Sequence, residues 1–410
     1  MALLLGILLL RLTFLCVEYR EFVSKPFYYT NATVLLQYSK KKKGKSYEVL
    51  KLQSEDGKSF YTTSHHSVDM RDKMVRVKMF PSAKVSFFDY LGTFYIKTYL
   101  KIVGDAQDTG KEKLLNMIAS QHKSPEMVSF YQAIFLAAPV SKTLREKISG
   151  LGVSHLVALS GFHLTILWGL VYGMLSLLYK PAQQRWFPYR FMLLDMGLVA
   201  LGVLGAYLWF VDFPPSLLRS YTMLLIAWII LLLGIELVSF QFLGFVVMLL
   251  LALFPELIAS LGFWFSVAGV FYIYLVLYWS QKSEGWMSGK WAVSLLFIPI
   301  GIFILMLPVV HAIFGMSCKW QLLSPLLSLL FVVFYPLSIG LHLIGIGGIF
   351  DGGLLRLFEL PSKCYDHILP AWAVSGYILL SLAAIWSRTL FAAVIGAALL
   401  YLSYLFFFVQ

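Results

Sequence analysis

Long apolar runs fill the chain from about residue 152 to its end, and they limit the fold more than any other feature. Of the 410 residues, 59% are hydrophobic and 13% are charged, whereas a soluble domain has about 45–50% and about 25%. Several runs reach the roughly 20 residues that an α-helix needs to cross a bilayer. The sequence therefore predicts a polytopic α-helical membrane protein and excludes a soluble globular fold.

The apolar part, residues 151–410, predicts a transmembrane domain of about nine spans. We place them at 152–179, 190–211, 216–234, 237–254, 257–280, 290–315, 321–349, 368–386 and 388–410. Breaks such as Pro214-Pro215 and Gly345–Gly348 interrupt the runs. They are tolerated at membrane depth only where protein or a water-filled cavity satisfies the freed backbone groups. The four-residue spacing of Gly169 and Gly173 is typical of close helix packing.

The orientation follows from one short connection. Residues 180–190 carry Lys180, Arg185 and Arg190 and no acid, and positive charge in short loops marks the cytoplasmic side. The first long span then ends inside, so Gly152 lies at its outer end. Residues 1–19 are apolar apart from a few positions and lack a small-residue cleavage site, so we expect an uncleaved N-terminal membrane anchor.

Residues 24–105 predict a small, basic β domain. The stretch from Arg20 to Asp105 holds 16 Lys/Arg and eight Asp/Glu. Its net charge is therefore 16 − 8 = +8, which is most of the net charge of +12 of the whole chain. Alternating segments with Gly turns predict five strands, at 33–38, 47–52, 59–63, 73–79 and 92–101. Five short strands favour an OB-like barrel. Because it precedes the Gly152 end, we expect it on the extracytoplasmic side.

Lysines and aromatic rings are interleaved along this β domain. A cationic groove with stacking rings is how OB-folds bind single strands. The cationic candidates are Lys41, Lys42, Lys43, Lys45, Arg76 and Lys78. The aromatic residues are Tyr28, Tyr29, Tyr47, Phe60, Tyr61, Phe94, Tyr95 and Tyr99. For any single ring, a place in the barrel core is the competing interpretation.

Residues 106–150 predict short amphipathic helices. We expect these helices to lie at the membrane interface or to be re-entrant.

The segment Gly152–His163 reads Gly-Val-Ser-His-Leu-Val-Ala-Leu-Ser-Gly-Phe-His. It places two histidines, two serines and two glycines at the head of an apolar run, where polar groups are costly. His155, Ser160 and His163 could line a water-filled path with neutral donors and acceptors. Alternatively, they bond across helices while Gly161 permits a close approach. Both interpretations stay open.

This segment resembles the signature of the ComEC competence proteins, and later segments resemble the family's motifs in the same order. Pro215–Met223 resembles a Pro-Ser-apolar-x-Arg motif. Gly262–Ser266 resembles Gly-Phe-Gln-Leu-Ser, with Trp264 in place of Gln. Ser317–Leu326 resembles a stretch that usually carries Asn, here replaced by Ser324. The basic β domain resembles the family's N-terminal OB-like domain, so the resemblance covers nearly the whole chain.

The resemblance implies a channel that translocates single-stranded transforming DNA across the bacterial inner membrane during natural competence. It implies no cofactor and no enzymatic activity, because the metallo-β-lactamase-like domain of many members has no counterpart in the sequence. The paired loop cysteines of the family are also missing. The implied path residues are His155, Ser160, Gly161, His163, Arg219, Trp264 and Ser266. Arg219 could meet phosphates or pair with Asp212.

The implied partners are single-stranded DNA and a periplasmic DNA-binding receptor outside, with a helicase-like motor and single-strand-binding proteins in the cytoplasm. A motor is expected because the chain contains no Walker A pattern. The resemblance leaves open a separate nuclease and a homo-oligomer.

Other classes remain as alternatives. An intramembrane serine hydrolase would use Ser160 with His311 or His342 as its base. A small-solute transporter would need inverted repeats with matched broken helices, and the sequence offers no convincing internal symmetry. His65-His66 and the Cys364–His367 cluster lack a full metal-ligand set. Whether Cys318 and Cys364 pair is left open.

Overall fold

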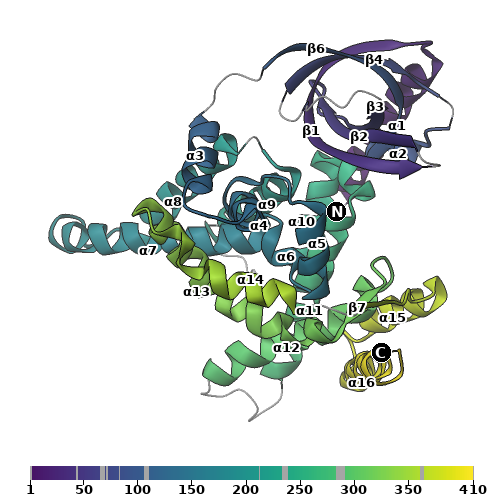
Figure 1. Cartoon of the computed structure of the whole chain (residues 1–410). Helices are drawn as coiled ribbons and strands as arrows, with labels where there is room; N and C mark the ends of the chain where they lie inside the picture. The colour runs from purple at the N-terminus through teal and green to yellow at the C-terminus, as the bar shows by residue number, and fades with distance from the viewer. Residues whose placement is uncertain are drawn as a thin grey trace. The chain divides into compact units, whose positions relative to one another are not determined.

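The computed structural model describes residues 2–42, 45–64, 70, 73–82, 84–105, 110–211, 213–232, 239–282, 291–360 and 364–409. The chain divides into two compact units (Figure 1). The first combines Met1–Gly110 with Gly244–Trp264, and the second combines Lys111–Leu243 with Phe265–Gln410. The predicted class, a helical membrane protein with an N-terminal β domain, is confirmed.

The first unit is built on a six-stranded sheet. Its strands are β1 (Tyr28–Lys42), β2 (Lys45–Ser54), β3 (Ser59–Ser64), β4 (Lys73–Phe80), β5 (Thr93–Tyr95) and β6 (Lys97–Asp105). The order across the sheet is β5-β3-β2-β1-β4-β6, and all neighbours are antiparallel except β3 and β5. Its helices are α1 (Ala2–Ser24), α2 (Phe87–Leu91) and the 3-10 helix η1 (Pro255–Ala259), with part of α10 (Phe240–Leu253).

The expected closed barrel is wrong. The five predicted strands are present, but the fifth bends at Ile96 and divides into β5 and β6, which form the two edges of the sheet. Because these edges are consecutive parts of one run of chain, the sheet curls strongly (Figure 1) without a closing ladder among the described strands. A bond between the hydroxyls of Thr62 and Thr98, 2.8 Å apart, brings β3 near β6.

Alternation along the strands builds the core of this sheet. On β4, Val75, Val77 and Met79 are buried, whereas the residues between them face outward. This is the period of two that a half-buried strand requires. Phe22 of α1 packs into the same core, against the rings of Tyr90 and Phe94. The apolar N-terminal helix is therefore fastened to the β domain by its last turns.

The second unit is helical. Before and within the signature segment lie α3 (Gly110–Ala119), α4 (Pro125–Leu136), α5 (Lys142–Gly150) and α6 (Ser154–Val157). Then follow α7 (Gly161–Trp186), α8 (Met192–Phe210), α9 (Pro215–Leu232), α11 (Leu261–Gln281), α12 (Trp291–Val310), α13 (Ser324–Leu343), α14 (Asp351–Glu359), α15 (Ala371–Ala383) and α16 (Arg388–Tyr404). Short elements are the 3-10 helices η2 (Lys319–Leu323) and η3 (Gly347–Phe350), the strands β7 (Met316–Cys318) and β8 (Cys364–Asp366), and a π-helical turn, η4 (Leu405–Val409).

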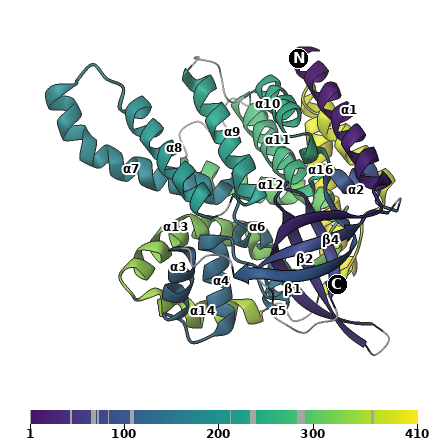
Figure 2. The same cartoon turned by 90° about the horizontal axis from the view of Figure 1, so that it is seen from above.

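The described residues include six helices that are long and apolar enough to cross a membrane. They are Ala2–Ser24, Gly161–Trp186, Met192–Phe210, Leu261–Ser280, Lys319–Leu343 and Arg388–Phe407. Four other expected spans appear as apolar helices of 10–17 described residues, and the expectation of about nine spans after Gly152 stays a prediction. Figure 2 shows α7 and α8 side by side as a long hairpin. Lys180 and Arg185 lie in the last turns of α7, and Arg190 lies in the connection to α8.

The cysteines of the second unit settle a question that the sequence leaves open. Cys318 and Cys364 form a disulfide between directly opposed positions of β7 and β8, with their Cα atoms 4.5 Å apart. The bond joins the segment before α13 to the segment before α15. Disulfides persist in oxidising compartments outside the cytoplasm.

Candidate functional site

The signature segment Gly152–His163 does not form the head of one continuous helix, as the sequence suggests. Gly152 adopts a left-handed conformation with φ +69° and ends α5. The short helix α6 follows, and Ser160 is extended before α7 begins at Gly161. Of the polar residues, Ser154 and His155 lie on α6, Ser160 lies in the extended link and His163 lies in the first turn of α7. They are therefore close to helix ends, where the backbone has groups to satisfy.

The start of α13 holds the first half of this segment. Ser324 Oγ donates to the carbonyl oxygen of Gly152 at 3.0 Å, and Gln321 Nε2 donates to Ser149 O at 3.2 Å. A Cβ on Gly152 would lie 3.2 Å from the side chain of Gln321. Glycine is thus required here both by its φ and by the approach of Gln321. Ser324, which replaces the Asn of the resembled motif, still supplies a hydrogen-bond donor.

His155 also contacts α13. Its Nε2 lies 3.2 Å from Ser328 Oγ, and Ser328 Oγ donates to Ser324 O at 2.8 Å. Since the serine hydroxyl has only one hydrogen, His155 Nε2 is the donor in the first bond. The ring of His155 is exposed on the unit. Among the predicted path residues, it is the histidine that a polar ligand can reach.

Ser160 and His163 form a local pair. Ser160 Oγ and His163 Nδ1 are 3.3 Å apart. His163 is fully buried, and its ring meets the edges or faces of Phe331 and Tyr335 at 5.1 and 4.9 Å between centroids. The packing favours the structural interpretation of His163 over a place on a water-filled path.

Gly161 lies against α9. A Cβ at this position would be 3.0 Å from Ser220 Oγ, so a larger residue would press on Ser220 and push α7 and α9 apart. The contact brings the signature segment next to the residue that follows Arg219. In contrast, no described atom lies within 4 Å of a Cβ built on Gly169 or Gly173, so the described residues do not show the close packing that their spacing predicts.

Trp264 and Ser266 have contacts of their own in other parts of the structure. Trp264 belongs to the first unit, where its indole nitrogen donates to Ile258 O at 3.0 Å. Ser266 lies on α11, whose apolar residues pack in a different cluster with α12, α15 and α16. Asp212, the alternative partner of Arg219, lies outside the described residues. Ser220, Gln321 and Ser328 are site residues that sequence reasoning missed, because nothing local pairs them with residues 152–163.

The β domain carries a second candidate surface, on the outer face of β1, β4 and β6. The strand register places Tyr29, Lys78 and Tyr99 in one row across these strands. Lys78 Nζ lies 4.4 Å from the ring centre of Phe27, 5.4 Å from that of Tyr29 and 5.5 Å from that of Phe80. Phe80 and Tyr99 meet edge to face at 5.5 Å. We call these five residues the aromatic platform.

The platform is open to solvent and surrounded by positive charge. Tyr29 is 51% exposed and Tyr99 is 74% exposed. The next row of the register pairs Arg76 with Lys101, and both side chains are exposed. Exposed rings held around a cation provide π-faces for bases beside cations for phosphates.

The other residues of the β domain that were considered for DNA binding are either not described or have structural roles. Lys43 lies outside the described residues, and the side chains of Lys41, Lys42 and Lys45 are not described. Phe60 and Phe94 are core residues, as the competing interpretation held. Lys58 is a structural cation, because its Nζ bonds the hydroxyl of Tyr90. Burial lowers the pKa of Lys58 and raises the pKa of Tyr90 to about 12.

The described part of the chain contains no metal site. It also does not bring His311 or His342, the bases of the alternative hydrolase, to Ser160. No group of three His, Cys, Asp or Glu residues that could hold a metal ion occurs among the described residues. His65-His66 lies outside them. His311 Nδ1 contacts Leu307 O, and His342 bonds His122 and Ser338, so neither proposed base is bonded to Ser160.

The fold and these surfaces define a multi-pass membrane protein with a basic extramembrane sheet. A family model described as competence protein matches residues 137–408. The chain belongs to this family, and it takes part in DNA uptake during competence. No curated protein and no solved structure matches the chain.

Proposed function

We propose that this protein conducts single-stranded DNA across the inner membrane during natural competence. In this proposal the aromatic platform receives the strand, and the outer end of the helical unit, near His155, admits it. The exposed rows of rings and cations on β1, β4 and β6 carry the proposal. Stacking on rings is tolerant of sequence, and cations beside the rings follow the backbone charge. A protein that takes up any transforming DNA needs both properties.

Two independent markers support the orientation. The Cys318–Cys364 disulfide adjoins η2 and α13, which bond the segment at the head of α7. Lys180 and Arg185 lie near the other end of α7, and a helix of 26 residues is about 39 Å long. The oxidising side and the basic, cytoplasmic side are thus assigned to opposite ends of one helix. Both assignments put Gly152 outside the cytoplasm.

The same side is proposed for the β domain. Between Ser24 and Gly161, the described residues include no helix long and apolar enough to cross a membrane. The platform and the head of α7 would therefore face the same compartment. A strand bound outside could then pass toward the helical unit without first crossing a membrane.

A binding measurement tests the platform. The full chain in lipid nanodiscs is titrated with a fluorescent single-stranded oligonucleotide, and anisotropy is followed over a range of salt concentrations. Tyr99→Ala should weaken binding by roughly 5- to 150-fold, because one stacked base contributes about 1–3 kcal/mol. Lys78→Gln should lower the slope of log affinity against log salt by about 0.7, the value for one phosphate contact with a single strand.

Tyr95→Ala is the matched control. Tyr95 is 53% exposed on β5, at the other edge of the sheet, and is outside the platform. Equal affinity for the wild type, Tyr99→Ala and Lys78→Gln would refute the platform as the receiver. Equal losses in Tyr95→Ala and Tyr99→Ala would refute its location.

The Ser160–His163 bond favours one second candidate, an intramembrane serine hydrolase. A serine nucleophile needs a histidine within hydrogen-bond reach, and His163 Nδ1 lies 3.3 Å from Ser160 Oγ. Ser160→Ala separates the two functions. Loss of peptide cleavage with DNA uptake retained would support the hydrolase, whereas retained uptake with no cleavage in either protein would support the channel.

A further inference from the structure

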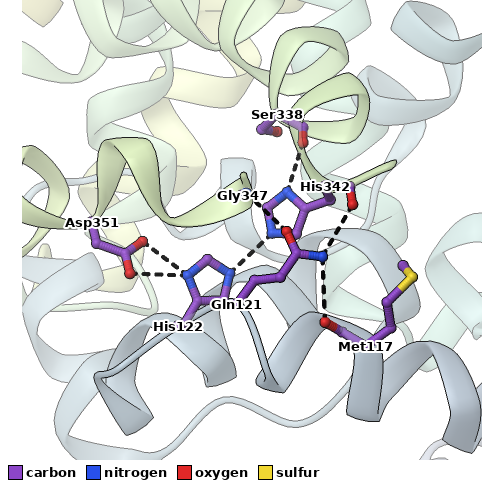
Figure 3. A network of polar contacts seen from close by, with 7 residues as sticks. All are labelled: Met117, Gln121, His122, Ser338, His342, Gly347 and Asp351. Atoms are coloured by element: carbon purple, nitrogen blue, oxygen red, sulfur yellow. Dashed lines mark hydrogen bonds and ion pairs between the residues drawn. The ribbon is translucent and has the colours of Figure 1, made fainter. Parts of the chain in front are cut away.

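A buried polar chain connects three distant parts of the helical unit (Figure 3). His122 lies in the turn between α3 and α4, His342 in the last turn of α13, and Asp351 at the start of α14. His122 Nδ1 is 3.0 Å from both carboxylate oxygens of Asp351, and His122 Nε2 is 3.0 Å from His342 Nε2. His342 Nδ1 is 2.6 Å from Ser338 O. We call His122, His342 and Asp351 the triad.

The acceptors at its two ends determine how many protons the triad holds. The carbonyl oxygen of Ser338 can only accept, so His342 Nδ1 carries a hydrogen. A neutral His342 therefore presents a lone pair at Nε2. If Asp351 is a carboxylate, His122 Nδ1 also carries a hydrogen, and a neutral His122 presents a second lone pair. Two lone pairs 3.0 Å apart repel, so this pairing needs one more proton.

We propose that the triad is a buried proton-binding site, which clamps the α3–α4 turn to the α13–α14 corner only while it holds three protons. With three protons, one imidazolium donates through Nε2 to the other ring, and Asp351 balances its charge. Moving one proton from His122 Nδ1 to Asp351 gives a neutral acid and two neutral rings, with every hydrogen bond kept. The net charge is zero in both forms, which suits a buried site.

Two glycines adapt the backbone to this cluster. A Cβ on Gly347 would lie 2.6 Å from the His342 ring, and a Cβ on Gly348 would lie 2.8 Å from Gln121 O. The side chain of Gln121 fastens the same corner, since its Nε2 donates to His342 O at 3.0 Å and its Oε1 accepts from Gly347 N at 2.8 Å. The site is therefore built from both sides rather than left by loose packing.

The aromatic ring packed directly against the triad does not change its charge. From α4, Tyr131 stacks on His122 at 4.4 Å and meets His342 at 4.6 Å between ring centres. Burial and the charge of Asp351 raise the pKa of Tyr131, so its ring stays neutral.

Charged residues near these elements point elsewhere. Lys123 and Arg356 are exposed, and Glu126 of α4 pairs with Lys147 at 2.8 Å. Within the triad, the two histidines are buried and the side chain of Asp351 is 19% exposed. Protons therefore enter and leave through Asp351.

The consequence is a contact that weakens as pH rises. Losing the third proton sets the two Nε2 lone pairs against each other, and the α3–α4 turn loses its bond to α13. A fourth proton on the second ring would set two N–H groups against each other, so acid strong enough to charge both rings also opens the contact. Histidine is the side chain that ordinarily titrates between pH 5 and 8.

One test detects the proton directly in the wild-type protein. The full chain, labelled with ¹⁵N at histidine, is studied by NMR in lipid nanodiscs from pH 5 to pH 8. We expect one hydrogen coupled to the Nε2 atoms of two different rings, with its signal absent from His122→Asn. Two neutral rings with bare Nε2 atoms throughout this range would overturn the proposal.

A second test uses a residue that donates without an extra proton. In His342→Gln, the side-chain amide can donate to His122 Nε2 at any pH. The unfolding equilibrium constant of the wild type should rise with pH relative to that of His342→Gln, by up to tenfold per pH unit, because one proton is released. His367→Gln, the same substitution outside the triad, should follow the wild type. Parallel profiles for the wild type and His342→Gln would refute the bound proton.

Discussion

Ser324 donates its hydroxyl hydrogen to the carbonyl oxygen of Gly152, 3.0 Å away, and so ties the start of α13 to the start of the signature segment. The two residues are 172 positions apart. This bond, together with that from Gln321, fixes the turn that precedes α7. The polarity of the signature thus serves partly to join two segments that are distant in sequence.

Ser324→Ala should destabilise the protein by about 1–3 kcal/mol, because a carbonyl in a packed turn loses its donor. Ser324→Asn restores an N–H donor, so its loss should be smaller. Denaturant unfolding of the purified protein in nanodiscs measures both. If the Ala and Asn variants lose the same stability, the bond to Gly152 does not hold this turn.

Gly161→Ala should cost about 1–3 kcal/mol, as overpacking does in a close contact. The new methyl group would meet Ser220 Oγ at 3.0 Å. Adding Ser220→Ala should recover part of the loss, since it removes the nearest atom. Gly169→Ala is the control on the same helix, because its Cβ would have no neighbour within 4 Å. Equal losses at Gly161 and Gly169 would refute the close approach of α9.

The Cys318–Cys364 bond should contribute about 2–4 kcal/mol to stability. In intact cells of a Cys16→Ala strain, neither remaining cysteine should react with a membrane-impermeant maleimide until the cells are reduced from outside. Reduction should then make Cys364, which is exposed, react with the reagent, whereas Cys318 is buried. Reaction of both thiols before reduction would contradict the disulfide and the orientation drawn from it.

Gly347→Ala should disrupt the triad, because the added methyl group would overlap the His342 ring. We expect a loss of stability together with a loss of the pH dependence attributed to the third proton. Gly353→Ala is the control, since a Cβ there would meet no atom within 4 Å. A Gly347→Ala protein with the wild-type pH profile would show that the ring has room to move.

Local patterns predicted much of the fold. Strand positions follow from alternation, as on β4, where Val75 and Val77 point inward and Arg76 points outward. The break before α7 was missed, because Ala158 to Ser160 sit in an apolar run and hydropathy does not register an extended link. The OB-like barrel was predicted from the number of strands, and strand count alone does not determine whether a last ladder forms.

The sites depend on contacts that no local pattern contains. Lys78 was predicted from charge, and alternation puts Phe80 on the same face of β4. Phe27 lies beside Lys78 only because β1 pairs with β4. The triad joins His122 to His342, 220 positions away. Its one sequence signal was the break at Gly345–Gly348, which turned out to be the backbone that admits the ring.

The most direct test of the proposed channel is to ask what the incoming strand touches. A photoreactive amino acid placed at Tyr99, at His155 or at Tyr95 is activated in competent cells while they take up labelled transforming DNA. We predict crosslinks to single-stranded DNA from positions 99 and 155 and none from position 95. Undiminished uptake with no crosslink from position 99 or 155 would contradict both the platform as receiver and the outer end of the helical unit as entrance.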